Sequence, residues 1–126
     1  MWLLLAACDD HLFLPEGGEL APGFCGVEPV LQSSCALGGC HDAATATGGL
    51  DLETDALTAL VGVESANYAG QAYVVAGDSA TSLLYLKVAG TDAGTRMPLG
   101  TPLGATEIAA IQAWIDDGAT GCAVAP

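Results

Sequence analysis

Hydrophobic side chains recur at helical spacing in four short segments of the chain. In the clearest segment, Ile108, Ile111 and Ile115 repeat at intervals of three and four residues, with Trp114 beside them. Gly118 follows this run, and glycine often ends a helix. Together with three weaker segments, the pattern predicts helices over residues 26–34, 55–61, 79–88 and 106–117.

The segments between these helices are long and rich in Gly, Thr and Pro. Residues 73–76 are apolar and predict a short extended stretch, whereas residues 90–102 predict a loop. Loops of this length in a small domain usually carry function. We therefore expect one all-α domain over residues 25–122, with about four short helices and long loops around a bound group. Residues 123–126 would form a short tail.

The N-terminal residues predict a targeting signal rather than folded structure. Residues 1–7 are apolar, but a bilayer span needs about 20 residues. The stretch Leu5-Ala6-Ala7-Cys8 resembles a bacterial lipobox, which implies export, acylation of Cys8 and a lipid anchor at the periplasmic face of a bacterial membrane. No Lys or Arg precedes the apolar run, so an unprocessed start with a chance cysteine stays an alternative. Residues 9–24 predict a flexible tether.

The charge of the chain is strongly unbalanced. Fifteen acidic residues face two cations, Lys87 and Arg96, and the formal net charge is −13. Such a surface repels phosphate backbones, which excludes nucleic acid as a partner. It suits a partner protein with a basic docking face, although acidity also serves solubility alone.

The sequence Cys35-Ala-Leu-Gly-Gly-Cys40-His41 is the candidate functional motif. A c-type haem is attached through two cysteines, and the histidine that follows them ligates the iron; the usual spacing is Cys-x-x-Cys-His. Here four residues separate the cysteines, and on a regular helix these would point about 140° apart. Residues 36–39 are therefore expected to bulge out of the helix, which Gly38 and Gly39 permit.

Two other interpretations of this motif stay open at this stage. The cysteines could pair in a disulfide, or they could bind a metal ion together with His41. Zinc usually takes four ligands, and His41 is the only histidine in the predicted domain. We therefore prefer covalent haem, with Cys35, Cys40 and His41 as its protein ligands.

The second axial ligand of the iron is expected to be Met97. A thioether opposite a histidine is a common arrangement in electron-transfer haem proteins and raises the reduction potential. Met97 could instead fill the core, and the alternatives for the iron are His11 from the tether or a vacant position. Arg96 could pair with a haem propionate or be a surface charge.

The order of several motifs resembles exported bacterial cytochrome c-like domains, including the planctomycete-type cytochromes. The resemblance rests on the cysteine–histidine motif, residues 48–52 (GGLDL), residues 74–85 (VVAGDSATSLLY), residues 96–98 (RMP) and residues 106–119 (TEIAAIQAWIDDGA). It implies one haem, Met97 as distal ligand, and a first helix that crosses the last. The four-residue spacing between Cys35 and Cys40 departs from the usual family pattern.

The resemblance also implies a role for the two remaining cysteines. If the first and last helices cross, Cys25 and Cys122 could meet in a disulfide. We therefore expect a monohaem electron carrier without catalytic residues, whose partner is a redox protein. The alternatives are a disulfide-stapled lipoprotein that acts as a non-redox interaction module, and a haem sensor or peroxidase-like enzyme with an open iron position.

Overall fold

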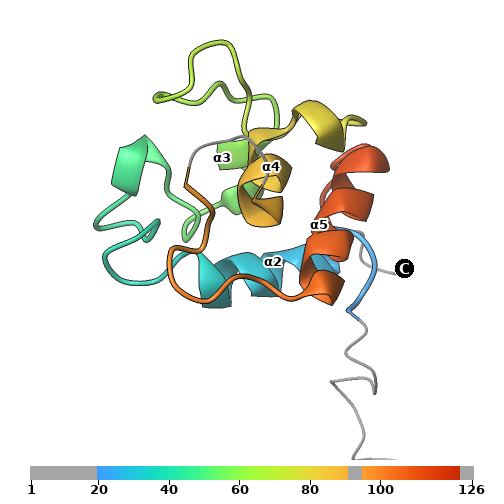
Figure 1. Ribbon diagram of the computed structural model, residues 1–126, viewed down its shortest axis with the longest axis horizontal. Helices are drawn as coiled ribbons and strands as arrows, with labels where there is room; N and C mark the ends of the chain where they lie inside the picture. The colour runs from blue at the N-terminus through green and yellow to red at the C-terminus, as the bar shows by residue number, and fades with distance from the viewer. Residues whose placement is uncertain (1–19, 91–94, 123–126) are drawn as a thin grey trace, which may run out of the picture.

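A computed structural model describes residues 20–90 and 95–122 of the chain. Within these residues there are four α-helices: α2 (Phe24–Ser34), α3 (Ala56–Leu60), α4 (Leu83–Ala89) and α5 (Ala105–Asp116). Two short 3₁₀ segments, η2 (Thr47–Gly49) and η3 (Ser79–Thr81), lie between them (Figure 1). The described residues form no strands beyond two isolated bridges, so the predicted all-α class is confirmed.

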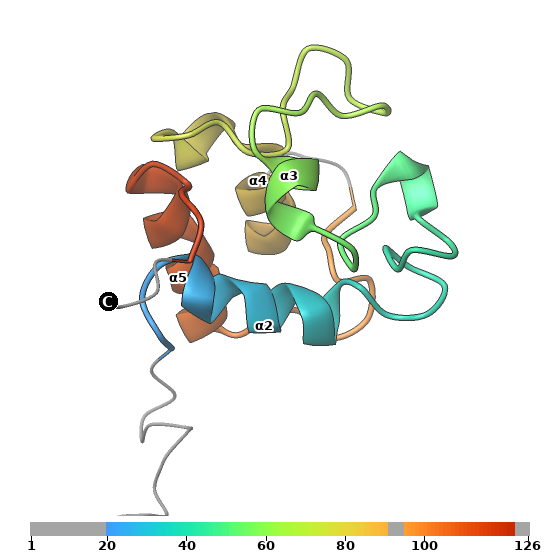
Figure 2. The same ribbon diagram turned by 180° about the vertical axis from the view of Figure 1, so that it is seen from behind.

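Helices α2 and α5 pack against each other and form the base of the domain (Figures 1 and 2). The ring of Phe24 lies 5.1 Å from the ring of Trp114, measured between centroids. Val27 and Leu31 of α2 and Ile111 and Ile115 of α5 are fully buried, so one apolar face of each helix forms this interface. The predicted crossing of the first and last helices is therefore confirmed.

The backbone just before α2 packs closely against the first turn of that helix. A Cβ atom on Gly26 would collide with the carbonyl of Ala21, so only glycine lets the preceding segment fold back over the helix. The helix begins at Phe24, two residues before the predicted start. The tether predicted over residues 9–24 includes Phe24, but this residue belongs to the core and is 5% exposed.

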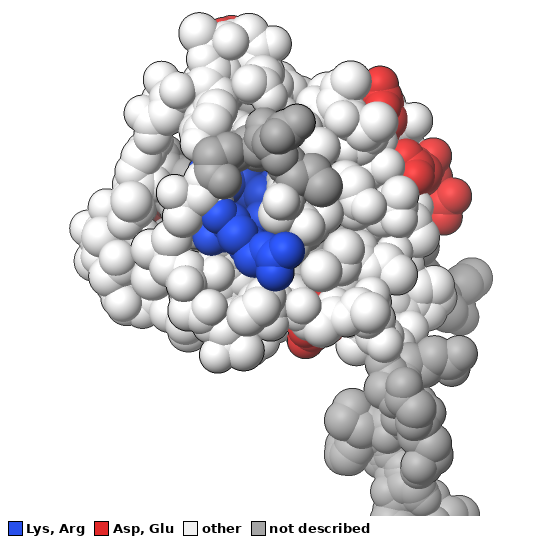
Figure 3. All heavy atoms as spheres, in the orientation of Figure 1, with Lys and Arg blue, Asp and Glu red and all other residues white. Residues whose placement is uncertain are grey.

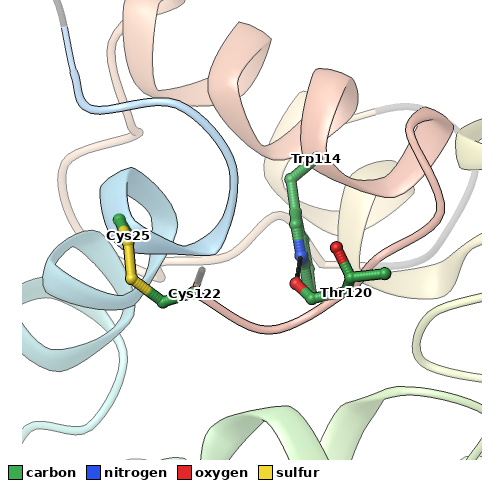
Figure 4. Close-up of a disulfide and its surroundings, with 4 residues drawn as sticks. All are labelled: Cys25, Trp114, Thr120 and Cys122. Atoms are coloured by element: carbon green, nitrogen blue, oxygen red, sulfur yellow. Dashed lines mark hydrogen bonds between the residues drawn. A yellow bond between two sulfur atoms is a disulfide. The ribbon is translucent and has the colours of Figure 1, made fainter. Parts of the chain in front are cut away.

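A disulfide joins Cys25 of α2 to Cys122, which follows α5 (Figure 4). The two Cα atoms are 4.8 Å apart, within the usual range for disulfides, and 97 positions separate the cysteines in the sequence. Beside this bond, the indole N–H of Trp114 donates to the carbonyl of Thr120 at 2.8 Å. The covalent bond and the hydrogen bond both fasten the end of the described chain to the base.

The third predicted helix, over residues 79–88, is wrong in its first part. Residues 79–81 form the 3₁₀ segment η3, and α4 begins only at Leu83 because Ser82 between them is extended. The buried Ser82 hydroxyl donates to the carbonyl of Asp78 and accepts from the amide of Val75. The amide and the hydroxyl of Ser79 both donate to the carboxylate of Asp116 in α5.

None of the helices in the described part of the chain combines the length and hydrophobicity that a membrane span requires. The predicted lipidation at Cys8, the runner-up ligand His11, most of the tether and the tail lie outside the described residues.

Candidate functional site

Helix α2 places Cys35 at the edge of a cavity. The helix ends at Ser34, and the amide of Cys35 closes its last turn by donating to the carbonyl of Leu31. Cys35 is only 8% exposed and lines the cavity. Burial, together with the nearby thiol of Cys40, raises the pKa of Cys35 to about 11. Both cysteines are free thiols.

The four residues between Cys35 and Cys40 leave the helix as a looped insert. The amide of Cys40 donates to the carbonyl of Leu37, and the amide of His41 reaches back to the carbonyl of Cys35 at 3.1 Å. Gly39 has a φ of 86°, a conformation that glycine adopts without strain. The predicted bulge is therefore confirmed. It holds His41 directly after the helix end, while Cys40 is half-buried and does not line the cavity.

His41 is oriented by a hydrogen bond from its ring to the backbone. Its Nδ1 lies 3.1 Å from the carbonyl oxygen of Leu50. Because a carbonyl only accepts, Nδ1 carries the proton and Nε2 keeps the lone pair that a metal requires. The carbonyl of His41 accepts from the amide of Leu52, and the carbonyl of Leu52 accepts from the side chain of Gln32. Helix α2 therefore supports the histidine through residues 50–52.

Acidic residues brace the loop around His41. A carboxylate oxygen of Glu53 accepts from the amide of Ala43 at 2.8 Å. Asp51 accepts from the hydroxyl and amide of Thr54 and from the amide of Glu53, and these bonds lower its pKa. One buried oxygen of Asp42 has no partner among the described residues. Glu53 and Asp51 therefore shape the loop around His41.

Met97 enters the same cavity from the loop after α4. Its amide donates to the carbonyl of Lys87 at 3.1 Å, which ties the loop to that helix. The side chain is half-buried and lines the cavity together with His41 and Cys35. The fold thus brings together three of the four predicted haem ligands, although 62 positions separate Cys35 from Met97 in the sequence.

The cavity has about 720 Å³ of empty space, a figure that includes its opening to solvent. Its wall is mainly apolar and comes from residues distant in the sequence. The aliphatic members are Leu50, Leu52, Leu60, Leu83, Leu84 and Val88.

Polar side chains also line the cavity, and the sequence analysis missed them. The polar members are Thr47, Ser65, Asn67, Tyr68, Tyr73 and Lys87. The only available signal was that Lys87 is one of two cations in the chain. Arg96, the other cation, does not line the cavity; its guanidinium donates to the carbonyl of Ala89 at the end of α4.

Residues 38–98, just under half of the chain, match the family model described as planctomycete cytochrome C. No curated protein and no solved structure gives a significant match. The matched segment contains Cys40, His41 and Met97 and begins three residues after Cys35. This match supports a planctomycete-type cytochrome c-like domain over these residues, in agreement with the resemblance in the sequence.

The residues of the cavity fit the haem that this family implies. The cavity has a mainly apolar wall and is lined by a thioether side chain and a buried cysteine. It is also lined by a histidine whose backbone hydrogen bond uses Nδ1 and not Nε2. No group of three or more His, Cys, Asp or Glu in residues 20–90 and 95–122 is arranged to hold a bare metal ion.

Proposed function

We propose that this protein is a monohaem c-type cytochrome that carries electrons in the bacterial cell envelope. Cys35 and Cys40 would form the thioether bonds, and His41 and Met97 would be the axial ligands. The observation that carries the proposal is the meeting of Cys35, His41 and Met97 in one mainly apolar cavity. Haem, when bound, supplies the one-electron chemistry of its iron.

The protein's own residues would bind the haem and tune its potential. The bond from His41 to the carbonyl of Leu50 fixes the ring and its tautomer. The aliphatic wall lowers the local dielectric and keeps water from the site, and a thioether ligand favours the reduced form. We further propose that the protein is not an enzyme, that Cys8 anchors it by lipid at the periplasmic face, and that its partner is a redox protein.

A pyridine haemochrome spectrum with an intact mass tests the proposal. The chain would be expressed in a host with haem-attachment machinery and then treated with acid and denaturant. We expect a c-type spectrum and the mass of one retained haem, because addition of a thiol to a vinyl group loses no atoms. A Cys35→Ser/Cys40→Ser variant, which keeps the Cys25–Cys122 disulfide, is the matched control and should lose its haem under denaturant.

The absorption maximum of the haemochrome distinguishes one thioether bond from two. A colourless protein whose mass lacks only the hydrogens of paired cysteines would overturn the proposal. It would leave the disulfide-stapled lipoprotein that the sequence also allows.

A further inference from the structure

Lys87 occupies a distinctive position in this acidic protein. It is one of two cations against fifteen acids, and it is half-buried in the last turn of α4, on the wall of the cavity. Both cations lie beside each other on one face of the molecule (Figure 3). Burying part of an ammonium group is costly unless polar partners compensate for it, so the position calls for an explanation.

The ammonium group of Lys87, a residue that lines the cavity, is held by two hydrogen bonds. It donates to the hydroxyl of Tyr68 at 2.8 Å and to the carbonyl of Thr95 at 3.1 Å. It also lies 4.7 Å from the centre of the Tyr68 ring. Both of these acceptors, which lie in the described part of the chain, are neutral, and an ammonium has three donors, so these two bonds leave one N–H for a further acceptor.

The polarity of the cavity matches an apolar disc with a charged edge. Leucines and Val88 form most of the wall, while Lys87, Tyr68, Asn67 and Ser65 supply polar groups. Haem has this shape and chemistry, because its two propionates project from one edge of an otherwise apolar ring. In the described part of the chain no Asp or Glu lines the cavity, so the wall offers Lys87 no carboxylate as an ion-pair partner.

We infer that Lys87, held by Tyr68 and Thr95, binds a haem propionate in the cavity and thereby keeps that propionate ionised. This inference rests on the proposed function. It assigns the propionate contact to Lys87 rather than to Arg96, which is exposed and bonded to the end of α4. A charge-assisted hydrogen bond of this kind is stronger than a neutral one.

The inference predicts how the reduction potential depends on pH. A positive charge near the haem disfavours the ferric form, so Lys87→Gln should shift the redox equilibrium toward that form by a factor on the order of ten, or 59 mV for one electron. The same substitution should raise the propionate pKa, because its charge partner is lost. The pH range over which the potential falls should therefore move to higher pH than in the unchanged protein.

The titratable residues on the cavity wall allow a pH transition of the potential to be assigned to one group. They are Cys35, His41, Tyr68, Tyr73 and Lys87, and none is a carboxylate. With the cysteine and histidine bonded to haem, a transition between acidic and neutral pH would belong to the bound group.

The test is a potentiometric titration of the haem-loaded chain and its variants between pH 4 and 9. Arg96→Gln is the matched control, since it removes an equal charge from the same face without touching the cavity. We expect it to leave the pH profile in place, and we expect Lys87→Arg to restore the original profile. The near-infrared band of methionine-ligated ferric haem should persist in all three variants.

Three results would overturn the inference. An unchanged pH profile in Lys87→Gln would exclude the propionate contact. An equal shift in Arg96→Gln would show that the effect comes from the change in net charge and not from a specific contact. Loss of the near-infrared band in Lys87→Gln would mean that the lysine acts by holding the Met97 loop through Thr95. The proposed function would survive each result as long as the unchanged chain retains covalent haem.

Discussion

The two ends of this domain are built in different ways. At the base, α2 and α5 pack through fully buried side chains, and a disulfide closes the crossing. At the cavity, loops meet through backbone hydrogen bonds such as Leu52 to His41 and Met97 to Lys87. The base fills its interior with its own side chains, whereas the other end contains an open, mainly apolar cavity. We infer that the base supplies most of the stability and that the cavity end supplies the geometry for binding.

The strongest test of this difference is Trp114→Ala. Trp114 is 2% exposed, packs on Phe24 and donates to Thr120, so its loss should lower the free energy of unfolding by about 3–5 kcal/mol. Urea unfolding of the haem-free chain, followed by circular dichroism, measures the change. Leu99→Ala is the control, because Leu99 is 69% exposed and should change stability by no more than about 0.5 kcal/mol. A loss below about 1 kcal/mol at Trp114 would contradict the role assigned to the base.

The second test removes the covalent part of the base. A Cys25→Ser/Cys122→Ser variant opens a loop of about a hundred residues, which should cost roughly 4 kcal/mol. The same urea titration measures the loss. A Cys35→Ser/Cys40→Ser variant of the haem-free chain keeps the number of substitutions equal but acts at the cavity, and it should cost clearly less. Equal losses in the two variants would show that the disulfide has no special role at the base.

The third test compares the two cavity cysteines in the haem-free chain. The pKa of Cys35 is raised from 9.0 to about 11, so its thiolate fraction near pH 8 should be about a hundredfold lower than that of an unperturbed thiol. Iodoacetamide labelling followed by peptide mass spectrometry should therefore modify the more exposed Cys40 first, and labelling of Cys35 should accelerate up to about pH 11. Faster labelling of Cys35 at pH 8 would contradict its burial.

The same shift affects stability at high pH. The folded state favours the neutral thiol of Cys35, so its contribution is present below pH 9 and is lost as the pH rises toward about 11. A Cys35→Ser variant should lack this part of the alkaline loss of stability.

The base could be predicted from the sequence much better than the cavity. The spacing of Ile108, Ile111 and Ile115 fixed the buried face of α5 because helical periodicity is a local property. The looped insert before Cys40 followed from helix geometry and two glycines. Local signals failed at residues 79–82, where Ser79 bonds to Asp116 in α5 and the Ser82 side chain bonds to the backbone of Val75 and Asp78.

The cavity wall could not be predicted because it depends on tertiary contacts. Nothing near Leu50 in the sequence indicates that its carbonyl would orient His41, or that Glu53 would brace Ala43. Cys35, His41 and Met97 could be identified as candidates from the sequence, since their residue types are chemically distinctive. Lys87 was missed because a single lysine in a helix carries no local sign of what it faces.

The smallest expected effect separates the two ends most directly. Glu53 accepts from the amide of Ala43 in the cavity loop, and Glu107 accepts from the amide of Gly104 at the start of α5, both at 2.8 Å and both exposed. Because water can replace an exposed bond, Glu53→Ala and Glu107→Ala should each cost only about 0.5 kcal/mol. Hydrogen exchange should show faster exchange at Ala43 in the first variant and at the start of α5 in the second. If either substitution accelerated exchange equally at both ends, base and cavity would open as one cooperative unit, and the division between them would be wrong.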